Sequence, residues 1–98
     1  MDLASATASL REKVGTQSGL NTTLKFDCGD EGVVLIDGSA EPNTVDNHNR
    51  DAACTVALNL STLDDLIAGR LEPTTGFMTG RFKVSGDMSV ALKLQRVL

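Results

Sequence analysis

The chain has neither tryptophan nor tyrosine, and three phenylalanines are its whole aromatic content. Proteins that bind nucleic acid stack bases on aromatic side chains and follow the phosphates with basic ones. This chain does not interleave the two residue types, and its net charge is −4. The sequence therefore argues against a nucleic-acid partner.

Residue patterns for catalysis are equally scarce. The sequence contains one histidine, His48, and no glycine-rich phosphate loop, GxSxG nucleophile elbow or dinucleotide fingerprint. His48 lies between Asp46 and Asp51 in the polar stretch VDNHNRD, which lacks a second histidine for zinc and the Gly-x5-Glu end of a calcium loop. We predict a solvated loop here. We expect no catalytic residue, no metal and no cofactor, so the chain is not predicted to be an enzyme.

Two further absences bear on location. No apolar stretch approaches the roughly 18 residues of a membrane span, and residues 1–13 lack the basic start and apolar run of a signal peptide. Cys28 and Cys54 have no CxxC spacing and lie in strand-like runs, so we predict buried thiols. The expected location is the cytoplasm.

The composition itself is that of an ordinary globular protein. Hydrophobic residues make up 41% of the chain and charged residues 22%, with no low-complexity tract. A length of 98 residues supports a single hydrophobic core. We therefore predict one domain spanning residues 1–98.

The first half predicts a helix followed by strands. Residues 2–14 carry apolar side chains at helical spacing. Residues 24–28 alternate between apolar and polar, and residues 33–36 are apolar throughout, so the second strand should be covered more fully. A short edge strand is predicted at residues 44–46, and a further strand at residues 52–59.

The periodicity becomes helical again after this strand. Ser61 or Thr62 is predicted to cap a helix. Pro73 suits the first position of a shorter helix. A strand follows in which Phe82 and Val84 should point inward.

The last residues predict a helix with a wide apolar face. Asp87 is the expected N-cap of a helix over residues 88–98. Its apolar arc spans about 220°, interrupted by Gln95, whereas a surface helix needs only about 100°. Three things can cover the surplus: another part of the chain, a second subunit, or an apolar ligand held between helix and sheet.

Charge is unevenly distributed along the chain. Residues 1–79 carry five basic and twelve acidic side chains, net −7, and residues 80–98 carry four basic and one acidic, net +3. Arg81, Lys83 and Lys93 can contact an anionic headgroup, or they can simply form the solvated faces of a strand and a helix.

Residues 53–98 resemble a known family. They contain a polar–apolar strand, then AGRLEPTTGFMTG, then a match to G-[KR]-[LF]-K-[IV]-x-G-[DN]-M-x-x-A-x-K-L. This run is similar to the second half of the sterol carrier protein type-two domain, also called the non-specific lipid-transfer protein domain. The matching positions are Gly80, Arg81, Phe82, Lys83, Val84, Gly86, Asp87, Met88, Ala91, Lys93 and Leu94.

The resemblance implies an α+β fold in which helices cover one face of a five-stranded, mostly antiparallel sheet. It implies an apolar tunnel between the layers that binds and carries a fatty acid, fatty acyl-CoA, phospholipid or sterol-like lipid. We expect a monomer or homodimer that makes transient contact with a membrane or a lipid enzyme. The residues expected to contact lipid are Ile67, Phe77, Met78, Phe82, Val84, Met88, Leu92 and Gln95. The alternative is a non-catalytic interaction or dimerisation module of the same fold without a free lipid site.

Overall fold

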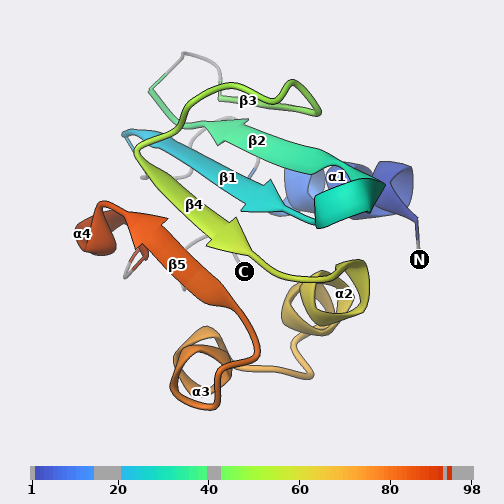
Figure 1. The fold of residues 1–98 in the computed structure, drawn as a ribbon. Helices are drawn as coiled ribbons and strands as arrows, with labels where there is room; N and C mark the ends of the chain where they lie inside the picture. Colours follow the sequence, from blue (N-terminus) through green and yellow to red (C-terminus); the bar gives the residue numbers. More distant parts are fainter. Residues whose placement is uncertain (1, 15–20, 40–42, 92, 94–98) are drawn as a thin grey trace.

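The computed structural model describes residues 2–14, 21–39, 43–91 and 93 (Figure 1). Helices and strands follow in an order close to the predicted one. The elements are α1 (Leu3–Val14), β1 (Thr23–Asp27), the 3-10 turn η1 (Gly29–Glu31), β2 (Val33–Asp37), β3 (Thr44–Asp46), β4 (Cys54–Ala57), α2 (Leu60–Ala68), α3 (Pro73–Met78), β5 (Lys83–Gly86) and α4 (Met88–Ala91).

The five strands form one mixed sheet in the order β3-β2-β1-β4-β5. Three neighbouring pairs are antiparallel, and the central pair, β1 with β4, is parallel. The mostly antiparallel sheet implied by the family resemblance is therefore confirmed. The edge strand predicted at residues 44–46 is β3, which pairs with β2 alone among the described strands.

The core lies between the sheet and the helices. In β1, Leu24 and Phe26 point to this side and are fully buried, while Lys25 between them points to the other side. The same alternation, carried across the sheet by the strand register, aligns the buried residues of the other strands. Helices α1, α2 and α4 all contribute to this cluster, with Ala6, Leu10, Val14, Leu63, Leu66, Ile67 and Val90.

The other face of the sheet is covered locally by the segment that follows β3. Leu35 lies on this face and is only 1% exposed. Over this face Lys25 Nζ donates to Asn49 Oδ1 at 3.1 Å. At the edge of the sheet, Asn47 Nδ2 donates to the Val33 carbonyl and to Thr7 Oγ1 of α1, each at 2.9 Å. The prediction that the unbroken apolar strand is covered on both faces is confirmed, because β2 is buried from Val33 to Ile36.

The first helix is also confirmed, and the last only in part. α1 spans residues 3–14, within the predicted range of 2–14. α4 spans Met88–Ala91, and residues 92 and 94–98 of the predicted final helix lie outside the described residues. Within the described part of the chain, no helix is long and apolar enough to cross a membrane.

Candidate functional site

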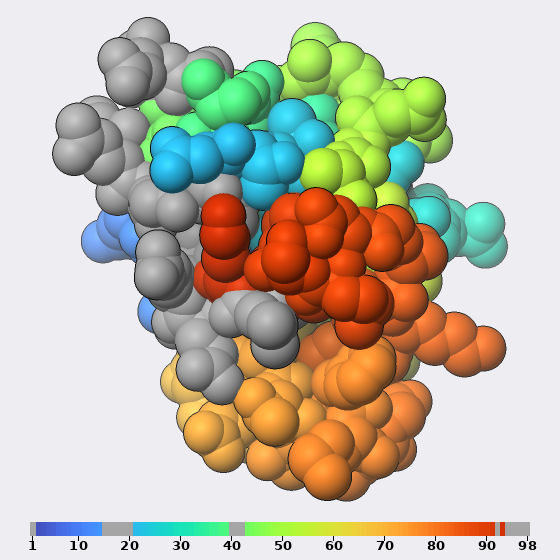
Figure 2. Space-filling view, turned by 90° about the vertical axis from the view of Figure 1, so that its left-hand side faces the viewer, coloured from blue at the N-terminus to red at the C-terminus, as the bar shows by residue number. Residues whose placement is uncertain are grey.

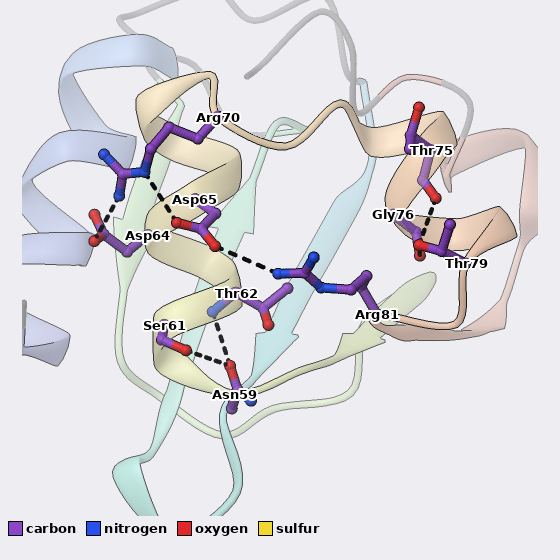
Figure 3. Close-up of polar contacts among 10 residues, drawn as sticks. All are labelled: Asn59, Ser61, Thr62, Asp64, Asp65, Arg70, Thr75, Gly76, Thr79 and Arg81. Carbon is purple, nitrogen blue, oxygen red and sulfur yellow. Dashed lines mark hydrogen bonds and ion pairs between the residues drawn. The ribbon is translucent and has the colours of Figure 1, made fainter.

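The site begins at α2, whose N-terminus is capped by Asn59. Asn59 Oδ1 accepts hydrogen bonds from the Thr62 N–H at 2.8 Å and from Ser61 Oγ at 3.1 Å (Figure 3). The predicted cap at Ser61 or Thr62 was wrong, because the asparagine before them is an equally good N-cap and starts the helix at Leu60. This start places Leu63 in the core with 0% exposure.

A charged cluster holds the chain as it leaves α2. Arg70 Nη2 lies 3.0 Å from Asp64 Oδ2, and Arg70 Nε lies 3.0 Å from Asp65 Oδ1 (Figure 3). The hydrogen bond to Asp65 raises the pKa of the Arg70 guanidinium. These groups are exposed to solvent, which screens the ion pairs and keeps the contribution of each pair to stability small. Both pairs connect the residue that follows the C-cap of α2 back to that helix.

Asp65 also links α2 to the turn before β5. Arg81 Nη2 lies 3.5 Å from Asp65 Oδ2 (Figure 3). Arg81 was a candidate for a headgroup contact, and in this structure its partner is Asp65. Lys83, two residues further on, has an exposed side chain. The carboxylate of Asp65 thus joins two arginines from opposite ends of the α3 segment.

Helix α3 packs against the rest of the molecule through a glycine. Pro73 occupies its first turn, as predicted, and Gly76 is its one buried residue. A Cβ atom at Gly76 would lie 2.6 Å from Phe82 Cε2 and 3.1 Å from Leu71 Cδ2. Only glycine lets the helix come this close to the Phe82 ring. Sequence reasoning missed Gly76, although a glycine inside a short helix is a signal of close approach.

Two phenylalanine rings connect the surface to the core beneath α3. The ring centroids of Phe77 and Phe82 are 6.3 Å apart, with the planes tilted by 42°. This separation is typical of interacting aromatic pairs. Phe77 is 48% exposed and Phe82 is 4% exposed. The pair therefore forms a continuous aromatic path from solvent to the core.

The turn from β5 into α4 is fixed by a close backbone contact. Gly86 has a φ of +94°, and a Cβ atom there would lie 2.4 Å from the Ala53 carbonyl oxygen. The Asp87 N–H donates to the same oxygen at 2.7 Å. Asp87 Oδ1 accepts hydrogen bonds from the Ser89 N–H at 2.9 Å and from Ser89 Oγ at 2.6 Å, and these bonds lower the pKa of Asp87. The predicted capping role of Asp87 is confirmed.

Three of the residues expected to contact lipid lie on the inner side. Ile67 and Phe82 are 7% and 4% exposed and belong to the main core cluster. Val84 is half-buried and packs against that cluster. The predicted inward orientation of Phe82 and Val84 is confirmed.

The other expected contacts lie nearer the surface or outside the described chain. Phe77 and Met88 are each 48% exposed, and Met78 is 80% exposed. Leu92 and Gln95 lie outside the described residues. The structure thus brings Phe77 next to Phe82 and leaves Met78 pointing into solvent.

Groups that could perform covalent chemistry lie elsewhere or are buried. Cys28 and Cys54 are free, buried thiols. Burial raises the pKa of both, that of Cys28 to about 11, so neither is a thiolate near neutral pH. His48 is exposed, and no group of three or more metal-binding side chains occurs among the described residues. The side chains that meet beneath α3 are apolar, which suits them to binding rather than to proton or group transfer.

Comparison with known sequences gives a consistent family. Residues 4–98 match the family model described as the SCP-2 sterol transfer family. Hydroxysteroid dehydrogenase-like protein 2 of Xenopus tropicalis is 34% identical over 84 residues, which cover 86% of this chain and 18% of that protein. Sterol carrier protein 2 of Bos taurus is 37% identical over 60 residues, which cover 61% of this chain and 10% of that protein. The chain therefore spans less than a fifth of either relative.

Comparison with solved structures confirms the fold. Sterol carrier protein 2 like 2 from Aedes aegypti superposes with a TM-score of 0.68, covering 98% of this chain and 92% of that chain. The two sequences are 18% identical. At this level of identity the similarity establishes a shared fold.

Proposed function

The chain belongs to the SCP-2 sterol transfer family, and on this basis we propose that it binds and carries a lipid in an apolar cavity between the sheet and the helices. The ligand class is a fatty acid, fatty acyl-CoA, phospholipid or sterol-like molecule. The observation that carries the proposal is the Phe77–Phe82 pair, which leads from a half-exposed ring to a buried one over 6.3 Å. No covalent step is needed for this function.

The proposed site has an inner wall and a mouth. Ile67, Phe82 and Val84 form the inner wall between α2 and β5. Phe77 and Met88 form the mouth, because each is 48% exposed. Methionine suits such a position since its unbranched side chain adapts to ligands of different shape. Leu92 remains a proposed wall residue and Gln95 a proposed polar contact.

The hydrophobic effect is large enough to drive binding. Each buried methylene contributes about 0.8 kcal/mol, so a sixteen-carbon chain can gain on the order of 10 kcal/mol before ordering costs are subtracted. Micromolar affinity needs about 8 kcal/mol. The gross gain from burying the acyl chain is therefore comparable to the free energy that micromolar binding requires.

A matched pair of substitutions tests whether Val84 faces a cavity. Val84→Phe adds bulk on the helix side of β5, and Ser85→Phe adds similar bulk on the opposite side of the same strand. If Val84 lines a cavity, Val84→Phe fills it, and affinity for a fluorescent fatty acid falls by about tenfold with little loss of stability. Overpacking a filled core costs about 1–3 kcal/mol instead. Ser85→Phe should leave lipid affinity unchanged.

Displacement of the fluorescent fatty acid measures affinity, and native mass spectrometry of gently purified protein detects copurified lipid. Two results would contradict the proposal. One is a clean apo mass with no fatty-acid binding. The other is a Val84→Phe variant that is strongly destabilised while its lipid affinity is unchanged. A concentration-dependent dimer seen together with a clean apo mass would favour the interaction module.

A further inference from the structure

Exposed apolar side chains are concentrated at the end of α3. Among the described residues, the large hydrophobic side chains that are exposed are Phe77, Met78 and Met88, at 48%, 80% and 48%. Phe77 and Met78 are the last two residues of α3, and we call this pair the α3 tip. Leaving two such neighbouring side chains in water carries a hydrophobic cost, which burial against a partner would remove.

The α3 tip is held in place by backbone hydrogen bonds. The Gly80 N–H donates to the Phe77 carbonyl at 3.2 Å, and the Arg81 N–H donates to the Gly76 carbonyl at 2.9 Å. Thr79 Oγ1 also donates to the Thr75 carbonyl at 2.8 Å (Figure 3). These bonds close the end of the helix while Met78 points outward. The exposure of Met78 is therefore built into a closed helix end.

The shape of this region fits a soft, extended partner. In Figures 1 and 2, α3 forms the lower end of the molecule, below β5. A stable protein–protein interface buries about 800 Å² on each partner, more than two side chains at a convex end supply. A bilayer surface accepts single apolar side chains that insert between headgroups, with a strength set by the apolar area buried.

The charge distribution favours the same partner. Residues 1–59 carry four basic and nine acidic side chains, net −5, whereas residues 60–86 carry three of each. Residues 1–59 form α1 and the strands β1 to β4, and β4 (Cys54–Ala57), the neighbour of β5, carries no charged side chain, so the acidic residues lie on the elements farther from β5. A surface lined with phosphate groups therefore repels the β3 side and tolerates the α3 side. Lys83 is exposed beside the buried Phe82 on this favoured side.

We propose that the α3 tip docks on a phospholipid bilayer, with Met78 inserted at the headgroup level. Phe77 then lies at the membrane surface with its ring 6.3 Å from that of Phe82. A lipid leaving the bilayer meets Phe77 first and the core-facing Phe82 next. This inference rests on the proposed lipid-binding function, and it identifies the surface through which the lipid is loaded.

Co-sedimentation with vesicles of phosphatidylcholine and the anionic lipid phosphatidylglycerol tests the docking surface. Met78→Ser removes the inserted side chain without changing charge, and Met78→Leu preserves its apolar character. We expect Met78→Ser to weaken vesicle binding by about tenfold, the scale for withdrawing one inserted methionine, and Met78→Leu to bind like the wild type. Ala8→Ser, on the exposed face of α1, is the control and should leave binding unchanged.

The outcomes separate this inference from the proposed function. Fatty-acid displacement is measured on the same variants, and a Met78→Ser variant that loses fatty-acid affinity but keeps its vesicle binding would place Met78 in the lipid site and overturn the docking surface. Equal vesicle binding by Met78→Ser and wild type would overturn the docking surface while the lipid site stands. A dimer that dissociates in Met78→Ser, without vesicle binding, would assign the tip to a second copy and also overturn it. Vesicle binding that depends on Met78, in a protein that binds no fatty acid, would support docking and reject the lipid site.

Discussion

The centre of the sheet and its β5 edge are stabilised in different ways. Around β1, β2 and β4, side chains such as Leu10, Leu24 and Phe26 are completely buried. At the β5 edge, α3 contributes one buried glycine, and Asp65 and Arg81 tie its segment to α2. The first region is held by apolar packing. In the second, Leu71, Phe82 and Val90 reach the core, and backbone hydrogen bonds and exposed ion pairs hold the rest. Stability therefore resides mainly in the first region, which leaves the second free to present apolar surface to a ligand.

Truncating one apolar side chain in each region should show the difference in packing most clearly. Leu10→Ala removes a fully buried side chain and should cost about 2–5 kcal/mol in the free energy of unfolding. Met88→Ala, at a position 48% exposed, should cost less than about 1 kcal/mol. Because the chain has no tryptophan, urea unfolding is best followed by far-ultraviolet circular dichroism. Equal losses would mean that the β5 edge is packed as tightly as the core.

Two glycines in the β5 region allow the cost of backbone strain to be measured separately from the cost of steric crowding. Gly80 and Gly86 both have positive φ values, +73° and +94°, but only at Gly86 would a Cβ meet neighbouring atoms. Gly80→Ala should cost about 1–2 kcal/mol, the cost of the left-handed conformation. Gly86→Ala should cost about 1–3 kcal/mol more, because the Ala53 carbonyl must move. The free energy of unfolding measures both, and a Gly80→Ala loss as large as that of Gly86→Ala would contradict the close contact.

A pH dependence of stability is expected within the packed region. Burial raises the pKa of Cys28 from 9.0 to about 11, so the folded state keeps the thiol protonated. The associated stability is fully present below pH 9.0 and is lost as the pH rises toward about 11. The free energy of unfolding should therefore fall over this pH range. The fall should be smaller in Cys28→Ala. If both proteins lose the same stability between these pH values, Cys28 is not the source.

Local patterns in the sequence predicted most of the fold. The apolar spacing of α1, the alternation in β1 and the capping aspartate Asp87 all depend on residues close in sequence, and the structure confirms each. The cap of α2 was misplaced because Asn59, Ser61 and Thr62 all favour that role, and in the structure the side chain of Asn59 accepts the hydrogen bond from the Thr62 N–H. The parallel pairing of β1 with β4 depends on contacts about 30 residues apart and has no local signature.

The candidate site was predictable in composition but not in exposure. The sequence places Phe77 and Met78 on a short helix that starts at Pro73, and both were expected in the lipid-contacting wall. Whether a side chain faces solvent or core depends on how Gly76 lets α3 sit on Phe82, which is a tertiary contact. For the same reason, the link between Asp65 and Arg81 could not be foreseen from residues 16 positions apart.

The sheet order also has a consequence for synthesis on the ribosome. The strands β1, β2 and β3 are consecutive in the chain and adjacent in the sheet, so they can pair as soon as they emerge. The other edge of β1 must wait for β4, because Leu24 pairs with Cys54 about 30 residues later. Until then, the nascent chain exposes an unpaired strand edge that is prone to aggregation. Its solubility during synthesis therefore depends on how quickly β4 arrives to cover that edge.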